Sequence, residues 1–148
     1  MGQAKDVVDE VWAALESHDL DGVEKLLDPS VSFRMGAESG RGTAKFVPLL
    51  RDYLTAFPDL RHEELDHAES GDSVALELVV KGTHTGRLQT PEGQLAPTGL
   101  EVVWETVDFM KVRDGRVASW HVYTDNLAFL VQLGLVPAPA SAGEQPVN

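Results

Sequence analysis

The chain has 148 residues, an apolar fraction of 43% and no cysteine, which fits one globular domain and excludes disulfides, thiol nucleophiles and thiolate metal sites. Its net charge of −12 argues against nucleic acid or an anionic membrane surface as a partner, because both require a basic patch. No apolar run reaches membrane-spanning length and no apolar signal segment opens the chain, so we expect a cytoplasmic protein.

The N-terminal part of the chain is predicted to be mainly helical. Apolar residues recur at helical spacing, and proline or polar clusters interrupt the pattern between segments. The expected segments are, in order, a helix over 3–17, a helix over 23–27 that Pro29 ends, a brief strand at 31–33, a loop at 38–43 and a helix over 44–57.

The remainder is predicted to form strands. Alternation of apolar and polar residues is weak over 60–68 and strong over 74–82, and it returns over 100–112 and 116–124 after a long loop. A turn at 113–115 joins the last two strands into a hairpin. Helices followed by an antiparallel sheet indicate the α+β class, in one domain over 1–137 with a disordered tail over 138–148.

The last predicted strand carries an unusual row of polar residues. Side chains alternate along a strand, so one face would carry Ser119, His121, Tyr123 and Asp125. A face with so many polar side chains is unsuited to a hydrophobic core, and we expect it to line a catalytic cavity. A two-residue hairpin turn would place His121 opposite Asp108, whereas a one-residue bulge would shift the register and remove that pairing.

Several short segments occur in a common order and spacing. They are the stretch 18–33, then Phe57-Pro58-Asp59-Leu60, Gly82-Thr83-His84-Thr85-Gly86, Pro97-Thr98-Gly99, and Asp125 followed by Gln132-Leu133-Gly134. The first resembles the start of nuclear transport factor 2-like domains. Together the segments resemble the SnoaL-like polyketide cyclase group of that superfamily, over roughly residues 7–137.

The resemblance implies a strongly curved antiparallel sheet that wraps over the helices and encloses one apolar pocket. It also implies a homodimer that pairs through the sheet. Enzymes of the group close the last ring of aromatic polyketides by an intramolecular aldol reaction, without a metal or organic cofactor. Their acid–base group is an acidic residue on the final strand, which Asp125 matches. Many members have His-Trp just before it, whereas this chain has Trp120-His121, which places His121 on the Asp125 face.

We therefore predict Asp125 as the catalytic acid–base group, with His84 and His121 assisting it. A carboxylate in an apolar pocket has a raised pKa, which makes it a competent base and afterwards a useful acid. Each candidate has a structural alternative. Asp125 also precedes a short helix, where an Asp N-cap is worth about 1 kcal/mol. His84 could be a surface-loop residue, and His121 could be a hydrogen-bonded core residue.

An apolar small-molecule substrate requires a lined pocket. Tyr53 offers a hydroxyl for a substrate carbonyl, Trp104 offers a flat wall, and Asp108 is expected to have a structural role. The predicted lining residues are Trp12, Phe33, Tyr53, Phe57, Trp104, Asp108 and Tyr123. No histidine–carboxylate cluster has the spacing of metal ligands, so no metal site is predicted.

Two other functions fit the same resemblance. An epoxide hydrolase of the limonene-epoxide type would need an Asp–Arg–Asp arrangement, and no arginine occupies an obvious inward strand position; Arg87 and Arg116 lie near loops. A non-catalytic binding protein could use the same pocket, since a fold does not determine an activity. A carboxylate in the pocket favours catalysis, because burying it costs free energy that a pure binder would avoid.

Overall fold

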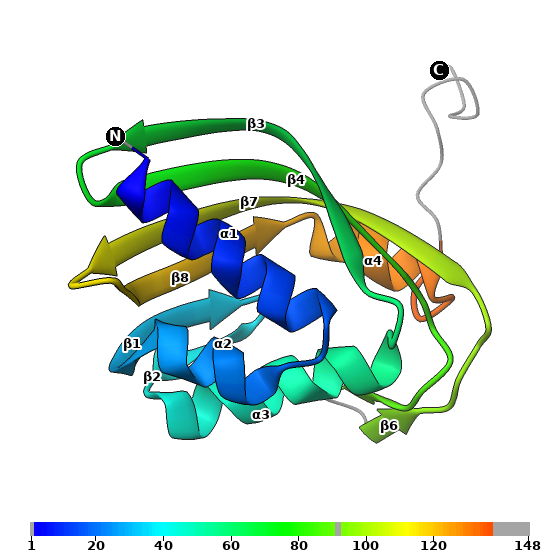
Figure 1. Cartoon of the computed structure of the whole chain (residues 1–148). Helices are drawn as coiled ribbons and strands as arrows, with labels where there is room; N and C mark the ends of the chain where they lie inside the picture. Colours follow the sequence, from blue (N-terminus) through cyan, green and yellow to red (C-terminus); the bar gives the residue numbers. More distant parts are fainter. Residues whose placement is uncertain (1, 91–92, 138–148) are drawn as a thin grey trace, which may run out of the picture.

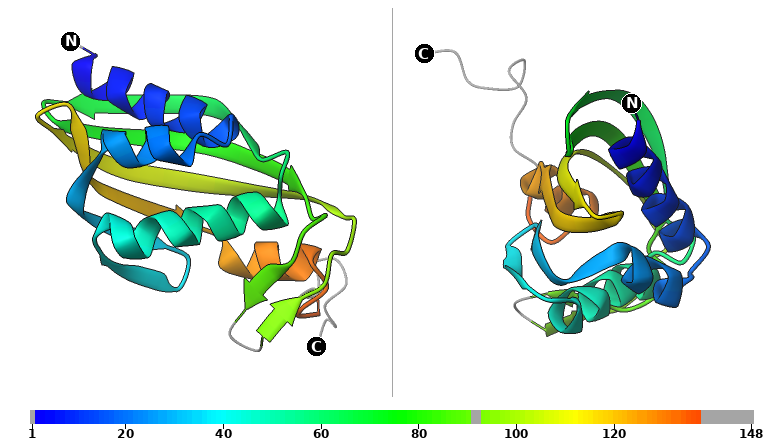
Figure 2. Two further views of the ribbon diagram at one scale, coloured as in Figure 1. Left: turned by 60° about the horizontal axis from the view of Figure 1, so that its bottom comes forward. Right: turned by 60° about the vertical axis from the view of Figure 1, so that its left-hand side comes forward.

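A computed structural model describes residues 2–90 and 93–137 of the chain. Three helices, α1 (Gln3–Glu16), α2 (Leu20–Leu26) and α3 (Thr43–Ala56), lie on the inner side of a strongly curved sheet (Figures 1 and 2). A fourth helix, α4 (Asn126–Gln132), follows the last strand and closes one end of the curve. The α+β class and the three N-terminal helices are therefore confirmed, while the expected tail over 138–148 lies outside the described residues.

The sheet has six strands in the order β2-β1-β8-β7-β4-β3. Their bounds are β1 (Leu27–Met35), β2 (Glu38–Arg41), β3 (Arg61–Ser70), β4 (Ser73–Thr83), β7 (Glu101–Arg113) and β8 (Arg116–Thr124). All neighbours are antiparallel except β1 and β8, which run parallel. The expectation of a wholly antiparallel sheet is thus wrong, because the chain reaches β8 from the far side of the sheet after passing through α3, β3, β4 and β7.

Three local predictions need correction. The first strand begins at Leu27, so Pro29 lies inside β1 and does not end a helix. The expected loop at 38–43 contains β2, which pairs with β1 around Phe33 and Gly40. The long loop before residue 100 contains a small hairpin of β5 (Leu88–Thr90) and β6 (Gly93–Leu95). These strands are too short for a period-two pattern to reveal them.

The core lies between the helices and the inner face of the sheet. Val8, Val11 and Leu15 recur on one side of α1 and are buried, as the helical spacing predicts. On β4 and β7 the inward residues alternate regularly, and Val74, Leu76 and Leu78 are all buried. Within the described residues, no helix is both long and apolar enough to cross a membrane.

A bulge in the β7–β8 hairpin decides which face of β8 points inward. Next to the turn Val112 pairs with Val117, but one step further Lys111 pairs with Ser119, so Ala118 is an extra residue. Beyond the bulge Asp108 lies opposite Val122, and His121 lies opposite Phe109. The predicted His121–Asp108 pairing is therefore wrong, and the bulged alternative is confirmed.

One polar side chain caps helix α4, and another joins the helix to the sheet. The Asp125 carboxylate accepts a hydrogen bond from the backbone N–H of Ala128 at 2.9 Å and caps the helix. The Gln132 amide pairs with the backbone of Val103, accepting from its N–H at 2.8 Å and donating to its carbonyl at 2.6 Å. These contacts hold Phe129 inward and bring α4 over the end of the inner face.

Candidate functional site

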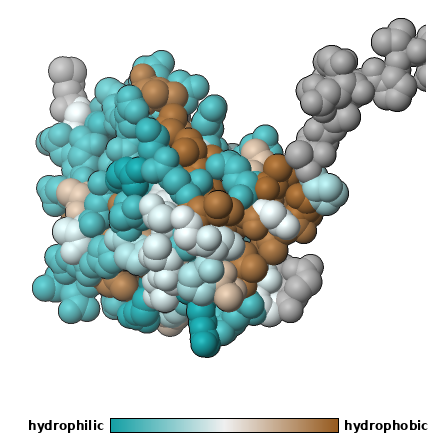
Figure 3. All heavy atoms as spheres, turned by 90° about the vertical axis from the view of Figure 1, so that its right-hand side faces the viewer, coloured by the Kyte–Doolittle hydropathy of each residue, from teal (hydrophilic) through white to brown (hydrophobic). Residues whose placement is uncertain are grey.

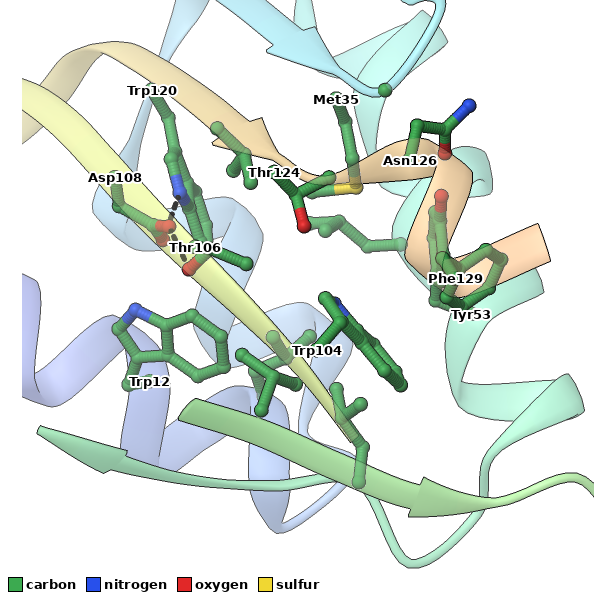
Figure 4. Close-up of a pocket in the computed structure, with 16 residues that line it drawn as sticks. Trp12, Met35, Tyr53, Trp104, Thr106, Asp108, Trp120, Thr124, Asn126 and Phe129 are labelled. Atoms are coloured by element: carbon green, nitrogen blue, oxygen red, sulfur yellow. Dashed lines mark hydrogen bonds between the residues drawn. The ribbon is translucent and has the colours of Figure 1, made fainter. Parts of the chain in front are cut away.

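The candidate site is an apolar pocket between α1, α3, α4 and the inner face of the sheet (Figure 4). It has an empty volume of about 650 Å³, a figure that includes its open mouth. All three tryptophans of the chain line it, namely Trp12 from α1, Trp104 from β7 and Trp120 from β8. Leu50, Met35 and Val122 supply further apolar wall.

Asp108 places a carboxyl group in this apolar wall. It lies in the middle of β7, points to the inner face and is fully buried. Trp120 donates a hydrogen bond from Nε1 to Asp108 Oδ2, and Thr106 donates one from its hydroxyl to Oδ1, both at 2.9 Å. Within the described pocket lining, Asp108 is the single carboxyl group, and the lining includes no lysine, arginine or histidine.

Burial raises the pKa of the Asp108 carboxyl from 3.8 to about 6, because the charged form loses its hydration. The hydrogen bonds from Trp120 and Thr106 act in the opposite direction and keep the increase moderate. A group with this pKa exchanges its proton readily near neutral pH, as an acid–base catalyst must. The two hydrogen bonds also fix the direction of the carboxylate oxygens.

A second indole N–H, that of Trp12, is turned toward this carboxyl group and helps to keep its pKa from rising further, although it forms no hydrogen bond of normal geometry with it. Trp12 is nearly fully buried, and its Nε1 has no hydrogen-bond partner among the described residues. Figure 4 shows the indole nitrogen on the edge of the ring that is turned toward Asp108. The Trp12 ring packs against the His62 ring, with centroids 4.4 Å apart and planes tilted by 31°, and the His62 ring pairs with Glu16. A buried donor without a partner at a pocket wall is available to a ligand.

The mouth of the pocket holds two further polar groups, Tyr53 from α3 and Asn126 from α4. The Tyr53 hydroxyl and Asn126 Oδ1 each lie 4.0 Å from the point that a Cβ on Gly36 would occupy. Gly36 has φ +62° in the turn after β1, a conformation that favours glycine, and its missing side chain leaves this space open. Burial, and secondarily Glu38, raises the pKa of Tyr53, so its hydroxyl keeps its proton.

The structure brings four of the predicted pocket residues together. Trp12, Tyr53, Trp104 and Asp108 all line the pocket. Phe33 and Phe57 lie behind its wall: Phe33 stacks on Phe46 at 4.7 Å, and Phe57 packs against Trp104 at 5.2 Å. Tyr123 is 54% exposed on the outer face of the sheet, so the prediction that it lines the pocket is wrong.

The polar face of β8 does not line a cavity. Because of the bulge, Trp120, Val122 and Thr124 point into the pocket, and His121 points outward. His121 Nε2 lies 3.0 Å from the Ser32 hydroxyl, and burial, Arg34 and Lys111 lower its pKa. Asp125 is exposed and caps α4, so the structure gives it the alternative role that the sequence offered.

His84 is fully buried but lies behind the wall of the pocket, against Phe57 at 5.5 Å. Its Nδ1 accepts a hydrogen bond from the backbone N–H of Thr98 at 3.2 Å, so the proton of the neutral ring lies on Nε2. Burial lowers the pKa of His84, which keeps the ring neutral. With backbone bonds from Gly99 and to Leu100, His84 ties together the two ends of the β5–β6 loop. The surface-loop alternative is therefore wrong, and His84, which was predicted to assist the reaction, is not among the residues that line the pocket.

Sequence reasoning undervalued Asp108 and did not consider Thr106 or Asn126. A usable signal was present in β7, where Val102, Trp104, Met110 and Val112 alternate as an inward apolar row that includes Asp108. A charged residue within such a row is costly unless it has a function or partners. Within the described residues, no group of three or more His, Asp or Glu side chains could hold a metal ion.

Comparison with solved structures supports the fold. AclR from Streptomyces galilaeus, described as a proposed hydroxylase, superimposes with a TM-score of 0.82 at 29% identity over 97% of this chain and 88% of AclR. IdmH from Streptomyces antibioticus, a proposed polyketide cyclase, gives a TM-score of 0.71 at 27% identity over 89% of this chain and 99% of IdmH. An epoxide hydrolase from M. tuberculosis gives 0.70 at 20% identity over 90% of each chain, which shows a shared fold.

A search of curated proteins found no match. The sequence profile of one family, described as SnoaL-like polyketide cyclase, matches residues 3–133, which is nearly the whole described chain. That match agrees with the curved sheet, the enclosed apolar pocket and the two structural neighbours above 25% identity. The chain belongs to the SnoaL-like polyketide cyclase family, within the nuclear transport factor 2-like fold.

Proposed function

We propose that the protein is a cyclase or isomerase that acts on a carbonyl-containing, apolar small molecule of the polyketide type through acid–base catalysis by Asp108. The observation that carries this proposal is a fully buried carboxyl group with a pKa of about 6 in the wall of an apolar pocket. Family membership supports the substrate type. Asp108 replaces Asp125 as the acid–base residue, because Asp125 is committed to capping α4 outside the pocket lining.

The proposed reaction is an intramolecular aldol closure. The Asp108 carboxylate removes a proton from a carbon next to a carbonyl group, and the resulting enolate carbon attacks a second carbonyl carbon of the same molecule. A carbon–carbon bond forms and the second carbonyl becomes an alkoxide. Asp108 then returns its proton to that alkoxide, so no atom is gained or lost. If a carbon–carbon double bond lies next to the deprotonated carbon, proton removal gives a dienolate, and its reprotonation at the far carbon would instead shift that double bond.

Trp12 is suited to stabilise the enolate oxygen. Its N–H is buried beside Asp108 and has no partner among the described residues, so a substrate oxygen could accept its hydrogen bond. A fixed donor aimed at developing negative charge lowers the barrier most in a site from which water is excluded. In this proposal Asp108 is the base, and Trp12 donates the hydrogen bond that stabilises the negatively charged oxygen.

The two alternatives receive less support. An epoxide hydrolase would need an arginine between two carboxylates, and the described pocket lining holds one carboxyl group and no arginine. A purely binding protein would have no use for a buried carboxyl group whose pKa is raised. The ring-closing or isomerising reaction uses both the carboxyl group and the free indole N–H.

We also propose that a second copy of this chain covers the outer face of the sheet. Val103, Val107, Phe109 and Tyr123 are exposed there on β7 and β8. A second group of exposed leucines, Leu100, Leu127 and Leu135, lies at the end of the molecule that carries α4, and Figure 3 shows hydrophobic side chains gathered at that end. Apolar exposure of this extent on a chain with a net charge of −12 favours a covered surface.

The experiment that tests the proposed chemistry measures hydrogen–deuterium exchange at C2 of 1-tetralone, a bicyclic ketone with acidic hydrogens next to its carbonyl. The rate should rise with pH through one ionisation near pH 6, since only the carboxylate form of Asp108 acts as a base. The exchange is followed by NMR, with buffer alone as the reference. A protein-dependent rate that does not vary between pH 5 and pH 8 would contradict a base with this pKa.

A further inference from the structure

The pocket has two separated polar ends with an apolar stretch between them. Asp108 and Thr106 form one end, and the Tyr53 hydroxyl and the Asn126 amide form the other (Figure 4). Trp120, Val122 and Thr124 face the pocket in succession along β8, from the Asp108 end to the start of α4. A strand rises about 3.3 Å per residue, so the four steps from Trp120 to Thr124 cover about 13 Å.

The Tyr53 end is built to receive one polar atom. The Tyr53 hydroxyl and Asn126 Oδ1 lie at equal distances of 4.0 Å from the empty position above Gly36. Tyr53 is half-buried and Asn126 is exposed at the mouth of the pocket, so a ligand can reach both side chains. A hydroxyl group placed between them could accept from Tyr53 and donate to Asn126, which would satisfy both side chains.

Tyr53 is well placed for such a contact because it stays protonated. Its side chain is half-buried on α3, and burial raises its pKa, so its hydroxyl is a hydrogen-bond donor at neutral pH. The wall between the two polar ends consists of Met35, Leu50, Trp104 and Val122. These apolar side chains favour binding of flat hydrocarbon rings over binding of a polar linker.

We propose that Tyr53 and Asn126 form a specificity subsite for a hydroxyl group on the ring edge opposite the reacting carbonyl. The substrate is then a fused-ring ketone with oxygen substituents at both ends, of which only the end at Asp108 reacts. This inference rests on the proposed function for the assignment of the reacting end. The subsite itself acts through binding and can be tested without any reaction.

The test uses a matched pair of probes, 1-tetralone and 6-hydroxy-1-tetralone, which differ by one hydroxyl on the aromatic ring. Both are shorter than the pocket, so the added hydroxyl tests the Tyr53 end without a simultaneous contact at Asp108. Binding is measured by quenching of tryptophan fluorescence, because all three tryptophans line the pocket. The wild-type protein should bind the hydroxylated probe about threefold to tenfold more tightly, the range for one net hydrogen bond. The 6-methoxy analogue cannot donate to Asn126 and should lose part of this preference.

Two variants and one control locate the effect. Tyr53→Phe and Asn126→Ala should each bring the two affinities close together while leaving the affinity for 1-tetralone nearly unchanged. Tyr123→Phe is the control, because Tyr123 is the second of the two tyrosines and is exposed on the outer face. It should retain the full preference. Equal affinities of the wild-type protein for the two probes, no binding of either, or an unchanged preference in Tyr53→Phe would overturn the proposal.

A separate readout distinguishes this proposal from the proposed function. Asp108→Asn should keep the preference for 6-hydroxy-1-tetralone, because Asp108 lies at the other end of the pocket. If that variant also keeps wild-type exchange at C2 of 1-tetralone while Tyr53→Phe loses the preference, the subsite stands and the catalytic role of Asp108 falls. If Asp108→Asn loses exchange and Tyr53→Phe changes nothing, the catalytic role stands and the subsite falls.

Discussion

The indole N–H of Trp120 on β8 donates a hydrogen bond to Oδ2 of Asp108 on the neighbouring strand β7, across 2.9 Å. This contact exists because Ala118 forms a bulge that turns Trp120 inward and His121 outward. The order Trp120-His121, together with the bulge, therefore determines which side chain contacts Asp108, and the alternation alone did not show this. It gives the buried carboxyl group an indole partner in place of an imidazole, so the partner cannot take up or release a proton.

Replacing Asp108 should make the protein more stable at neutral and alkaline pH. Its pKa in the folded protein, about 6, exceeds the ordinary value of 3.8, so ionisation above pH 6 destabilises the fold. At 1.36 kcal/mol per pKa unit, Asp108→Asn should gain up to about 3 kcal/mol at pH 8, and the gain should shrink as the pH falls from 6 toward 4. Urea unfolding at several pH values measures it.

The matched control for that series is Asp72→Asn, which removes a carboxylate from an exposed turn. It corrects for the general effect of lowering the negative charge of an acidic protein. An Asp108→Asn variant that is less stable than the wild-type protein at every pH would contradict the raised pKa.

Replacing Trp12 by Phe should slow proton exchange much more than it weakens binding. The change keeps an aromatic ring in the pocket wall and removes the unpartnered N–H beside Asp108. Loss of one oxyanion donor typically costs about 10²-fold or more in rate, so we expect a loss of that order at C2 of 1-tetralone. Trp104→Phe is the control in the same pocket. Equal losses in the two variants would show that the indole N–H of Trp12 has no special role.

Asp125→Ala should destabilise the protein by about 1 kcal/mol through loss of the α4 cap. Asp125→Asn should be nearly neutral, because Asn caps a helix as well as Asp does. Urea unfolding at pH 7 distinguishes the two variants. If Asp125→Ala were neutral or stabilising, the capping role would be wrong and the sequence-based assignment of Asp125 to the reaction would regain support.

The proposed dimer predicts that Phe109→Asp yields a monomer. Phe109 is exposed at the middle of the outer face of β7, and a buried carboxylate at a subunit interface would be costly. Leu65→Asp is the control, since Leu65 is an exposed leucine on the edge strand β3. Sedimentation velocity should give a dimer for the wild-type protein and Leu65→Asp. A wild-type monomer at high concentration, or a dimer of Phe109→Asp, would refute this interface.

Much of the fold could be predicted from the sequence, because long periodic segments such as α1, β4 and β7 carry strong patterns. Two features could not. The parallel pairing of β1 with β8 joins segments far apart in the chain, and residue patterns do not encode strand order. The bulge at Ala118 leaves the alternation on each side intact and only changes which face is buried.

The same bulge explains the errors at the site. His121 and Tyr123 share a face, as predicted, but it is the outer one. Trp120 was the available clue. Burying its large indole gains more free energy than burying the polar row on the opposite face, so the face that carries Trp120 is the one to expect in the core. Asp125 combined two signals that the sequence could not separate, a strand end and a helix cap. Three of the predicted pocket residues that line the pocket in the structure, Trp12, Tyr53 and Trp104, are large aromatic residues in strongly periodic elements.

The central claim is that Asp108, and not Asp125, supplies the acid–base chemistry. The most direct test compares hydrogen–deuterium exchange at C2 of 1-tetralone for Asp108→Asn and Asp125→Asn at pH 7.5. Both changes remove one carboxylate, and Asn preserves the cap at position 125. We predict that Asp108→Asn reduces the protein-dependent rate to near the buffer background and that Asp125→Asn retains it. Loss of exchange in Asp125→Asn together with its retention in Asp108→Asn would contradict the account.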